Sequence, residues 1–279
     1  MEVFDTPDGL RAWSRAHRAA GRRVGLVPTM GALHDGHLAL VDRAREDADV
    51  VALSIFVNPL QFNRSDDFTS YPRPLDDDLA LCRARRVDAV YAPLAATMYP
   101  DGFQTRVVPG ALAEVLEGAQ RPGHFEGVTT VVAKLFHAAE PDVAVFGQKD
   151  FQQLAIIRRM VADLDMGVTI VPMPIVREAD GLAMSSRNRR LSAAQRAAAA
   201  CVPRSLDAVA AAYDAGVRDV ATLVAAGRRV VDAEPLARFE HLEIVDGATL
   251  RGGPTAEPGS VAVTAVWFGD VRLIDNRLL

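Results

Sequence analysis

Residues 28–37 are the part of the chain best suited to chemistry, because two histidines and two glycines lie there between an apolar stretch and a predicted helix. Val24–Val27 is expected to form a short buried strand, and Leu38–Val41 repeats as one face of a helix. Unpaired N–H groups and the positive end of the helix dipole favour an anion at a helix start. His34 and His37, three residues apart, can face the same side of the first turn. The segment therefore predicts a phosphate-binding site.

Two other interpretations of His34 and His37 stay open from the sequence. Single histidines are usually surface residues or are satisfied by neighbouring groups, and histidine is also a common zinc ligand. Zinc needs three or four ligands, however, and no Cys or His cluster elsewhere in the chain completes such a set. Near a helix start the dipole disfavours imidazolium, so we expect neutral donors, or cations stabilised by a bound triphosphate.

Two further loops carry groups that bind phosphate. Gly147–Asp150 comes directly after the apolar run Val143–Phe146, and the Lys149 ammonium can contact phosphate oxygens. Asp150 is equally well interpreted as the cap of the helix that follows. Met184–Asn188 offers two hydroxyls and a guanidinium, although a polar interdomain linker would look similar. Together these groups can hold the charge that develops on a leaving pyrophosphate.

The second reactant is indicated by motifs that are missing and by amide side chains. The sequence contains no Gly-x-x-x-x-Gly-Lys-Ser/Thr loop, no Gly-x-Gly-x-x-Gly fingerprint and no Gly-x-Ser-x-Gly elbow. A phosphate site without a protein nucleophile indicates that the substrate itself attacks phosphorus, while the protein positions the reactants. Asn58, Gln61 and Gln153 can donate and accept at once, which suits a small molecule carrying hydroxyls and a carboxylate.

Carboxylates in the segment 66–78 are candidates for binding Mg²⁺. Asp66 and Asp67 lie near Tyr71, and the run Asp76–Asp78 follows. Mg²⁺ usually takes one or two carboxylates together with phosphate oxygens and water, and Asp77 is the ligand we select. Most of the run is better interpreted as the acidic first turn of a helix.

These loops are positioned by alternating strands and helices. Runs that are apolar at every position indicate strands covered on both faces, as in a doubly wound parallel sheet, where ligands bind at the carboxyl ends. The expected strands are Val24–Val27, Val50–Val57, Ala89–Tyr91, Val143–Phe146 and Val168–Val171. The expected helices are one from Thr6 and Pro7 to Gly21, then Leu38–Ala48, Leu75–Arg86, Val128–Ala139 and Phe151–Leu164.

The pattern changes beyond about residue 175, which predicts a catalytic domain over 1–175 and a smaller α+β domain over 176–279. Ser192–Gln195 is a capping box that opens a long alanine-rich helix, and Val220–Asp232 is a second helix. The expected strands of this domain are Phe239–Val245, Val261–Phe268 and Val271–Ile274.

Composition limits the class of protein. With 279 residues, 49% of them hydrophobic, the chain can bury a large core and form two domains. A net charge of −5 argues against nucleic acid as a partner. Cys82 and Cys201 show no metal or redox spacing, and no apolar run is long enough for export or membrane insertion. These features predict a cytoplasmic protein.

Six ordered segments make the chain resemble the pantothenate synthetase family, the AMP-forming ligases of pantoate and β-alanine. The resemblance covers nearly the whole length, and His34–His37 is similar to the His-x-Gly-His signature of the nucleotidyltransferase superfamily. Two family positions differ: Asp35 stands where glutamate is frequent, and Arg190 where an aromatic residue is common. The segments are PTMGALHDGH at 28–37, FVNPLQF at 56–62, DDFTSYPR at 66–73, RPGHFEGVTTVVAKLF at 121–136, FGQKDFQQL at 146–154 and VREADGLAMSSRN at 176–188.

The resemblance implies a two-step reaction with ATP and Mg²⁺. The pantoate carboxylate attacks the α-phosphorus to give pantoyl adenylate, and the β-alanine amine then expels AMP. It also implies a homodimer with a C-terminal lid. The implied nucleotide-binding residues are Pro28, Thr29, Met30, His34, Gly36, His37, Gly147, Gln148, Lys149, Asp150, Val176, Met184, Ser185, Ser186 and Arg187. Of these, His34, His37, Lys149, Ser185, Ser186 and Arg187 are the implied catalytic residues. Pantoate binding is assigned to Gln61 and Gln153, and further substrate binding to Asn58, Tyr71 and Arg121.

His37 is the residue commonly assigned as proton donor in this family, but its chemistry favours an electrostatic role. A carboxylate that attacks phosphorus needs no general base, and a charge-neutralised pyrophosphate needs little acid, so His37 is expected to stabilise the transition state as a hydrogen-bond donor. Two rival functions remain from the sequence: a nucleotidyltransferase that stops after nucleotide transfer, and a nucleotide sensor without catalysis.

Overall fold

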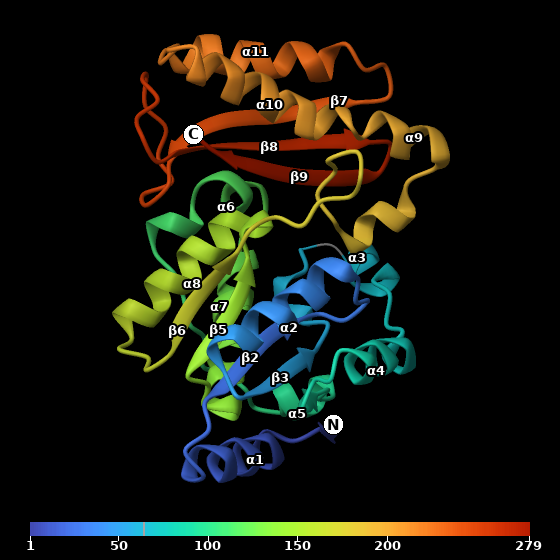
Figure 1. Ribbon diagram of the computed structural model, residues 1–279, viewed down its shortest axis with the longest axis vertical. Coiled ribbons are helices and arrows are strands. Elements are labelled where there is room, and N and C mark those ends of the chain that lie inside the picture. Colours follow the sequence, from blue (N-terminus) through green and yellow to red (C-terminus); the bar gives the residue numbers. More distant parts are fainter. Residues whose placement is uncertain (64) are drawn as a thin grey trace. The chain divides into compact units, whose positions relative to one another are not determined.

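The computed structural model describes residues 1–63 and 65–279, with the side chains of 65–67 left outside the description. The chain divides into two compact units. Unit 1 consists of Met1–Gln148 and Gln152–Pro174, and unit 2 of Lys149–Phe151 and Ile175–Leu279 (Figure 1). None of the helices in the described ranges has the length and apolar character needed to span a bilayer.

Unit 1 is built on a six-stranded parallel sheet, as the sequence predicts. The strand order is β1-β4-β3-β2-β5-β6, and all neighbours pair in parallel. Strand β1, which pairs with β4 at the sheet edge, was not expected, because three residues carry no detectable pattern. The strands are β1 (Glu2–Phe4), β2 (Val24–Thr29), β3 (Val50–Ile55), β4 (Ala89–Tyr91), β5 (Val143–Gly147) and β6 (Thr169–Met173).

Both faces of this sheet are buried, which explains why its strands are apolar at every position. Val24 and Leu26 of β2 pack in a cluster with residues of α1, α7 and α8. Val27 belongs to a second cluster, with residues of α2 and α4. Successive side chains of a strand point to opposite faces, so helices on both sides are needed to cover them. The helices are α1 (Pro7–Ala19), α2 (Asp35–Asp47), α3 (Ser65–Ser70), α4 (Leu75–Ala84), α5 (Ala95–Met98), α6 (Leu116–Gln120), α7 (His124–Ala139) and α8 (Phe151–Asp163), with short 3-10 turns η1 (Pro59–Gln61), η2 (Ala111–Ala113) and η3 (Gln148–Asp150).

Local signals fix the first helix as expected. Thr6 caps α1 by accepting a hydrogen bond from Gly9 N at 3.3 Å, Pro7 occupies the first turn, and Gly21 follows the end with φ of 74°. Helices α2 and α7 each begin earlier than the apolar pattern predicts, at Asp35 and His124, because polar residues form their first turns.

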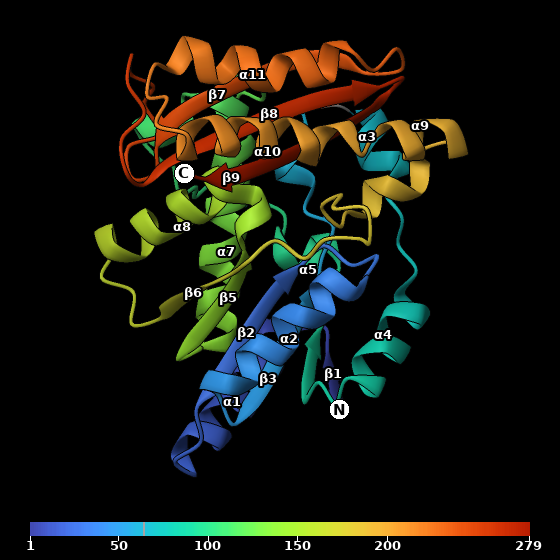
Figure 2. The same cartoon turned by 45° about the horizontal axis from the view of Figure 1, so that its top comes forward.

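Unit 2 contains an antiparallel sheet of order β7-β8-β9. Its strands are β7 (Arg238–Asp246), β8 (Ser260–Phe268) and β9 (Val271–Leu278), and its helices are α9 (Ala193–Ala198), α10 (Cys201–Asp214) and α11 (Val220–Asp232), preceded by η4 (Ser186–Arg190). Figure 2 shows α10 and α11 running along this sheet. Leu206, Val209 and Leu223 of the two helices pack against Leu242 and Ile244 of β7. The α+β architecture expected here is confirmed.

The single long alanine-rich helix expected after Ser192 is wrong. The capping box between Ser192 and Gln195 is present, but α9 ends at Ala198 and α10 begins at Cys201. Pro203 explains the break: its nitrogen has no hydrogen to donate to the Ala199 carbonyl, and its ring would clash with that carbonyl in a continuous helix.

Candidate active site

The carboxyl end of β2 lies at the point where the sheet reverses its strand order. From β2 the chain proceeds to β3 on one side, and later to β5 on the other. The ladder to β3 continues to Thr29, whereas the ladder to β5 covers Gly25 and Leu26. Pro28 suits the stretch beyond the β5 ladder, because it has no N–H to donate. In doubly wound sheets ligands bind at such a switch point.

The backbone after β2 is held by a buried carboxylate on α4. Both oxygens of Asp78, which is 2% exposed, accept backbone hydrogen bonds, from Ala32 N at 2.8 Å and from Leu33 N at 2.7 Å. Gly31 has φ of 81°, and a Cβ there would come within 2.9 Å of Asp78 Oδ2. The Thr29 hydroxyl also accepts a bond from Gly31 N at 3.1 Å. The loop that leads to the histidines is therefore fixed on both sides.

His34 caps helix α2 through its ring, and this bond fixes the tautomer of a neutral His34 ring. Its Nδ1 accepts a hydrogen bond from Gly36 N at 3.1 Å, so a neutral ring carries its proton on Nε2. The rings of His34 and His37 stack with centroids 4.1 Å apart. Two imidazolium cations at that distance would repel each other. The charge state and the roles of both residues stay predictions.

Asn58 and Gln61 form a hydrogen-bonded pair after β3. Asn58, 1% exposed, donates to Gln61 Oε1 at 2.9 Å and to Gly127 O at 3.0 Å, and its Oδ1 accepts from Tyr99 and from Leu60 N. These bonds use both amide protons and both carbonyl lone pairs of Asn58. We therefore expect Asn58 to affect a ligand through Gln61 rather than by direct contact.

The orientation of Gln61 is set at both ends of the residue. Its Nε2 lies 3.1 Å from Met30 Sδ, next to the histidine loop. Its carbonyl accepts hydrogen bonds from His124 Nδ1 at 2.8 Å and from Arg121 Nη2 at 3.1 Å. Arg121 Nη1 also lies 3.3 Å from His124 Nε2. Arg121 thus lies beside the predicted pantoate-binding glutamine.

Helix α7 approaches η1 so closely that only glycine fits at the crossing. A Cβ on Gly127 would lie 2.4 Å from Leu60 O. The sequence motif at 121–136 contains Gly127, but the sequence alone gives no packing reason for a glycine there.

Other candidates in unit 1 lie in different surroundings. Tyr71 is half-buried, and its ring packs edge-on against Phe62 with centroids 5.8 Å apart. Gln153 is half-buried on α8. Its buried neighbour Gln152, which the sequence did not single out, holds the segment before α6 by donating to Leu112 O and Val115 O and accepting from Glu117 N. Asp66 and Asp67 lie outside the described side chains.

The acidic residues at the start of α4 do not form a metal-binding cluster by themselves. In the described part of the chain, no three Asp, Glu, His or Cys side chains gather to form a metal site. Asp76 and Asp77 are exposed in the first turn of α4, whereas Asp78 is buried against the backbone. A nucleotide-bound Mg²⁺ needs only one or two protein carboxylates, and the Asp77 carboxylate is exposed.

In unit 2, the Lys149 side chain is 20% exposed and lies 3.8 Å from the Asp150 carboxylate. The loop that follows β6 folds back on itself, with Met184 N donating to Val176 O at 3.0 Å. Ser185 caps η4 by accepting from Arg187 N at 3.3 Å, and Ser186 and Arg187 form the first residues of η4. Lys149 and this loop thus belong to the same unit, which the sequence did not anticipate.

The two cysteines are not reactive groups. Burial raises the pKa of Cys82 to about 11, with the Asp78 charge adding to the effect, and burial likewise raises the pKa of Cys201 to about 11.

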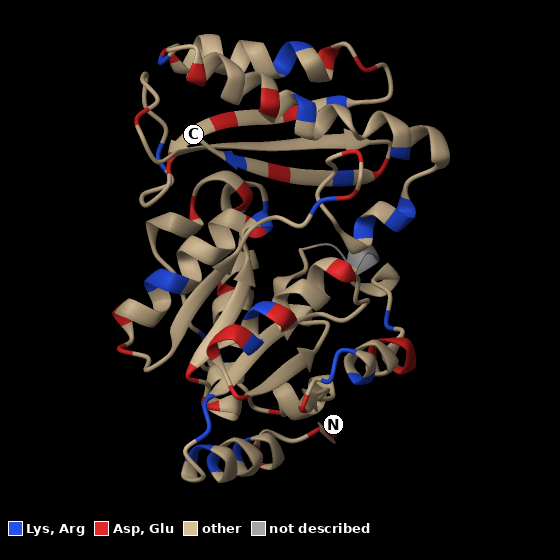
Figure 3. Cartoon of the chain, viewed as in Figure 1, with Lys and Arg blue, Asp and Glu red and all other residues tan. Residues whose placement is uncertain are grey.

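Figure 3 shows basic and acidic residues interleaved along the helices of both units.

Fold and site together define an α/β protein with a doubly wound parallel sheet and a histidine-bearing loop at its switch point. The Pantoate-beta-alanine ligase family model matches residues 2–278. The chain therefore belongs to the pantoate–β-alanine ligase family and is a ligase.

Individual members of this family match the sequence of this chain over nearly their whole length. Pantothenate synthetase of Geotalea daltonii is 50% identical over 279 residues, covering 100% of this chain and 99% of that protein. A crystal structure of pantothenate synthetase from Thermus thermophilus is 46% identical with a TM-score of 0.94, covering 100% of this chain and 99% of the other. Pantoate-beta-alanine ligase from Francisella tularensis, complexed with beta-gamma ATP and beta-alanine, is 32% identical with a TM-score of 0.82, covering 100% and 97%.

Proposed function

We propose that the chain condenses pantoate with β-alanine and converts ATP to AMP and pyrophosphate. A pantoate carboxylate oxygen attacks the α-phosphorus, and the bond to the β-phosphate breaks to release pyrophosphate. The β-alanine nitrogen then attacks the acyl carbon, loses a proton, and displaces AMP as the amide forms. The observation that carries this proposal is the capped histidine loop at the sheet's switch point, in a chain that matches this ligase family end to end.

In this proposal the histidines stabilise charge and do not transfer a proton. The hydrogen bond to Gly36 N leaves Nε2 of His34 as the donor for the triphosphate. His37 stacks on His34 and donates to the charge that develops as pyrophosphate leaves.

Gln61 is proposed to bind pantoate together with Gln153. Since Asn58 occupies Oε1 of Gln61, the Nε2 group is the one directed to a ligand, and it can leave the weakly accepting sulfur of Met30 for a carboxylate oxygen. Tyr71 and Arg121 are proposed to line the same site.

Unit 2 is proposed to supply the remaining phosphate contacts. Lys149, Ser185, Ser186 and Arg187 would bind the phosphates and the leaving pyrophosphate, and Val176 the adenine end. Charge-assisted hydrogen bonds of this kind contribute about 1.5–3 kcal/mol each. We propose 1–175 as the catalytic domain and 176–279 as a lid domain that excludes water when it closes, although Lys149–Phe151 group with unit 2.

We further propose that Mg²⁺ accompanies the nucleotide, with Asp77 as its protein ligand. When bound, the ion would withdraw charge from the phosphate oxygens. Asp78 is not assigned to the metal, because it holds the loop backbone. We also propose a cytoplasmic homodimer, which light scattering of the purified protein would test through its mass.

The test is exchange of labelled pyrophosphate into ATP. The proposal predicts exchange that depends on pantoate and needs no β-alanine, and AMP release that requires the amine. A nucleotide sensor would show no exchange, and a nucleotidyltransferase would accumulate a stable nucleotide product even with β-alanine present. Either result would overturn the proposed ligation.

A further inference from the structure

Strand β9 carries two adjacent buried polar residues that the proposed reaction does not use. Asp275 is 3% exposed and Asn276 is 5% exposed. Burial of a carboxylate or an amide is unfavourable unless each is hydrogen-bonded, so the partners of these residues show what they hold in place.

Asp275 holds the loop that precedes the two serines. It accepts a two-pronged contact from Arg177, with Nη1 2.7 Å from Oδ2 and Nη2 3.0 Å from Oδ1. The same Nη1 donates to Gly181 O at 2.9 Å, at the turn of the loop. Arg177 also pairs with Ala183 through an isolated antiparallel bridge. The carboxylate thus fixes the base and the turn of this loop through one guanidinium.

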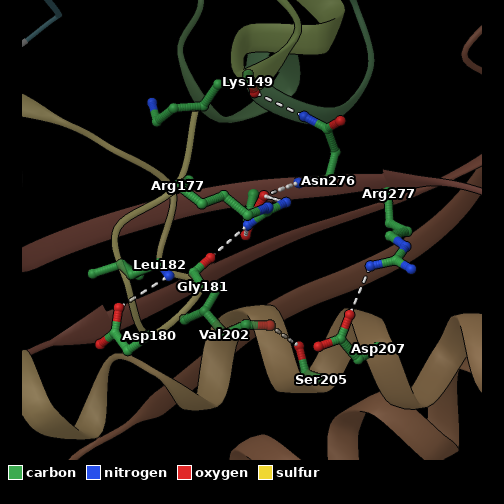
Figure 4. Close-up of polar contacts among 12 residues, drawn as sticks. Lys149, Arg177, Asp180, Gly181, Leu182, Val202, Ser205, Asp207, Asn276 and Arg277 are labelled. Carbon is green, nitrogen blue, oxygen red and sulfur yellow. Dashed lines mark hydrogen bonds and ion pairs between the residues drawn. The ribbon is translucent and has the colours of Figure 1, made fainter. Parts of the chain in front are cut away.

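Asn276 holds the Lys149 segment from the next position on the strand. Its Nδ2 donates to the Lys149 carbonyl at 2.9 Å, as Figure 4 shows. Its own backbone nitrogen lies 2.8 Å from Asp275 Oδ1, so the two residues are tied to each other as well. Successive strand residues point to opposite sides, which lets this pair contact two separate segments.

We propose that Asp275 and Asn276 are positioning residues that fix the Lys149 segment relative to the loop 176–187, so that both reach one triphosphate in register. This inference rests on the proposed function, in which Lys149, Ser185, Ser186 and Arg187 bind phosphate. Lys149 and Val176 are separated by helix α8 and strand β6, so the chain alone does not set their spacing. Strand β9 instead sets the spacing between Lys149 and the loop, and all three segments belong to unit 2.

The experiment compares Asn276→Ala and Asp275→Asn with Arg277→Ala as a matched control. Arg277 is the next residue of β9, but it pairs with Asp207 at an exposed position. The readouts are KM for ATP and KM for pantoate, measured by pyrophosphate exchange on the full chain. We expect Asn276→Ala to raise KM for ATP about tenfold, the effect of one hydrogen bond of ordinary strength, with KM for pantoate unchanged. Asp275→Asn should raise KM for ATP by at least about tenfold, because it weakens a charge-assisted pair with Arg177. The control should stay within about twofold of the unsubstituted protein for both constants.

Three results separate the outcomes. If the unsubstituted protein shows no pantoate-dependent exchange, the proposed function fails, and this inference with it. If that protein is active and Asn276→Ala keeps its KM for ATP, or raises both constants equally, the positioning role is wrong. Asn276→Ser, whose hydroxyl keeps a donor on a shorter side chain, should recover part of the lost ATP affinity if the variant folds as the control does. No recovery in a folded Ser variant would also contradict the role.

Discussion

The contact between Asp78 and the histidine loop gives the sharpest prediction from the structure. In Asp78→Asn the side chain keeps one acceptor oxygen, but the other position becomes an NH₂ group that faces a backbone N–H. One of the two bonds, at 2.8 and 2.7 Å, is therefore lost, and a donor is opposed by a donor. A hydrogen bond to a charged group is worth about 1.5–3 kcal/mol. At about 2–4 °C per kcal/mol for a protein of this size, the midpoint of thermal unfolding should fall by about 3–12 °C.

The same substitution should reduce adenylation, because the loop it loosens leads directly to His34. A displacement of a catalytic group by about 1 Å can cost about a hundredfold in rate, so we expect a loss of this order in pyrophosphate exchange. Asp76→Asn is the matched control, since Asp76 lies exposed in the same helical turn. Scanning calorimetry and the exchange assay measure both effects. If Asp78→Asn unfolds and exchanges like the Asp76 variant, the loop is not held by this carboxylate.

Three further substitutions test separate parts of the account. His37→Gln keeps a donor but cannot act as an acid, so it should retain at least about tenfold more exchange activity than His37→Ala, and equal losses would favour proton transfer. Gly127→Ala should lower the free energy of unfolding by about 1–3 kcal/mol, measured in urea, because the new Cβ would meet Leu60 O. It should also raise KM for pantoate. An unchanged stability would contradict the close approach of α7 to η1. The hydrogen bond from Arg196 lowers the pKa of Asp180, so this pair stabilises above the ordinary carboxyl pKa and the contribution is lost as the pH falls. The Asp180→Asn variant should therefore lose less stability than the unsubstituted protein between pH 6 and about pH 3. Equal losses of stability in the two proteins would show that the Asp180–Arg196 pair does not stabilise the fold.

Much of the fold could be predicted from local patterns. The strands of unit 1 are apolar throughout, and Thr6–Pro7 and Ser192–Gln195 mark helix starts through chemistry confined to a few neighbouring residues. Strand β1 could not be predicted, because three residues at a sheet edge have no such pattern. The helix break before Cys201 is caused by Pro203, which lies within an alanine-rich segment that otherwise favours one continuous helix.

The supports of the site could not be predicted, because they join distant parts of the chain. Asp78 contacts residues 46 and 45 positions away, and its sequence context is that of any acidic first turn. Asn276 contacts Lys149 from 127 positions away. Sequence motifs indicated which residues would contact a ligand, whereas the residues that orient them are set by tertiary packing and have no local signature.

The central claim is that the loop after β2 binds the triphosphate through its two histidines, His34 and His37. A crystal structure with pantoate and a non-hydrolysable ATP analogue tests it most directly. The account predicts a phosphate oxygen at about 3 Å from His34 Nε2, and a pantoate carboxylate beside Gln61 Nε2. A nucleotide bound away from His34 and His37 would contradict it.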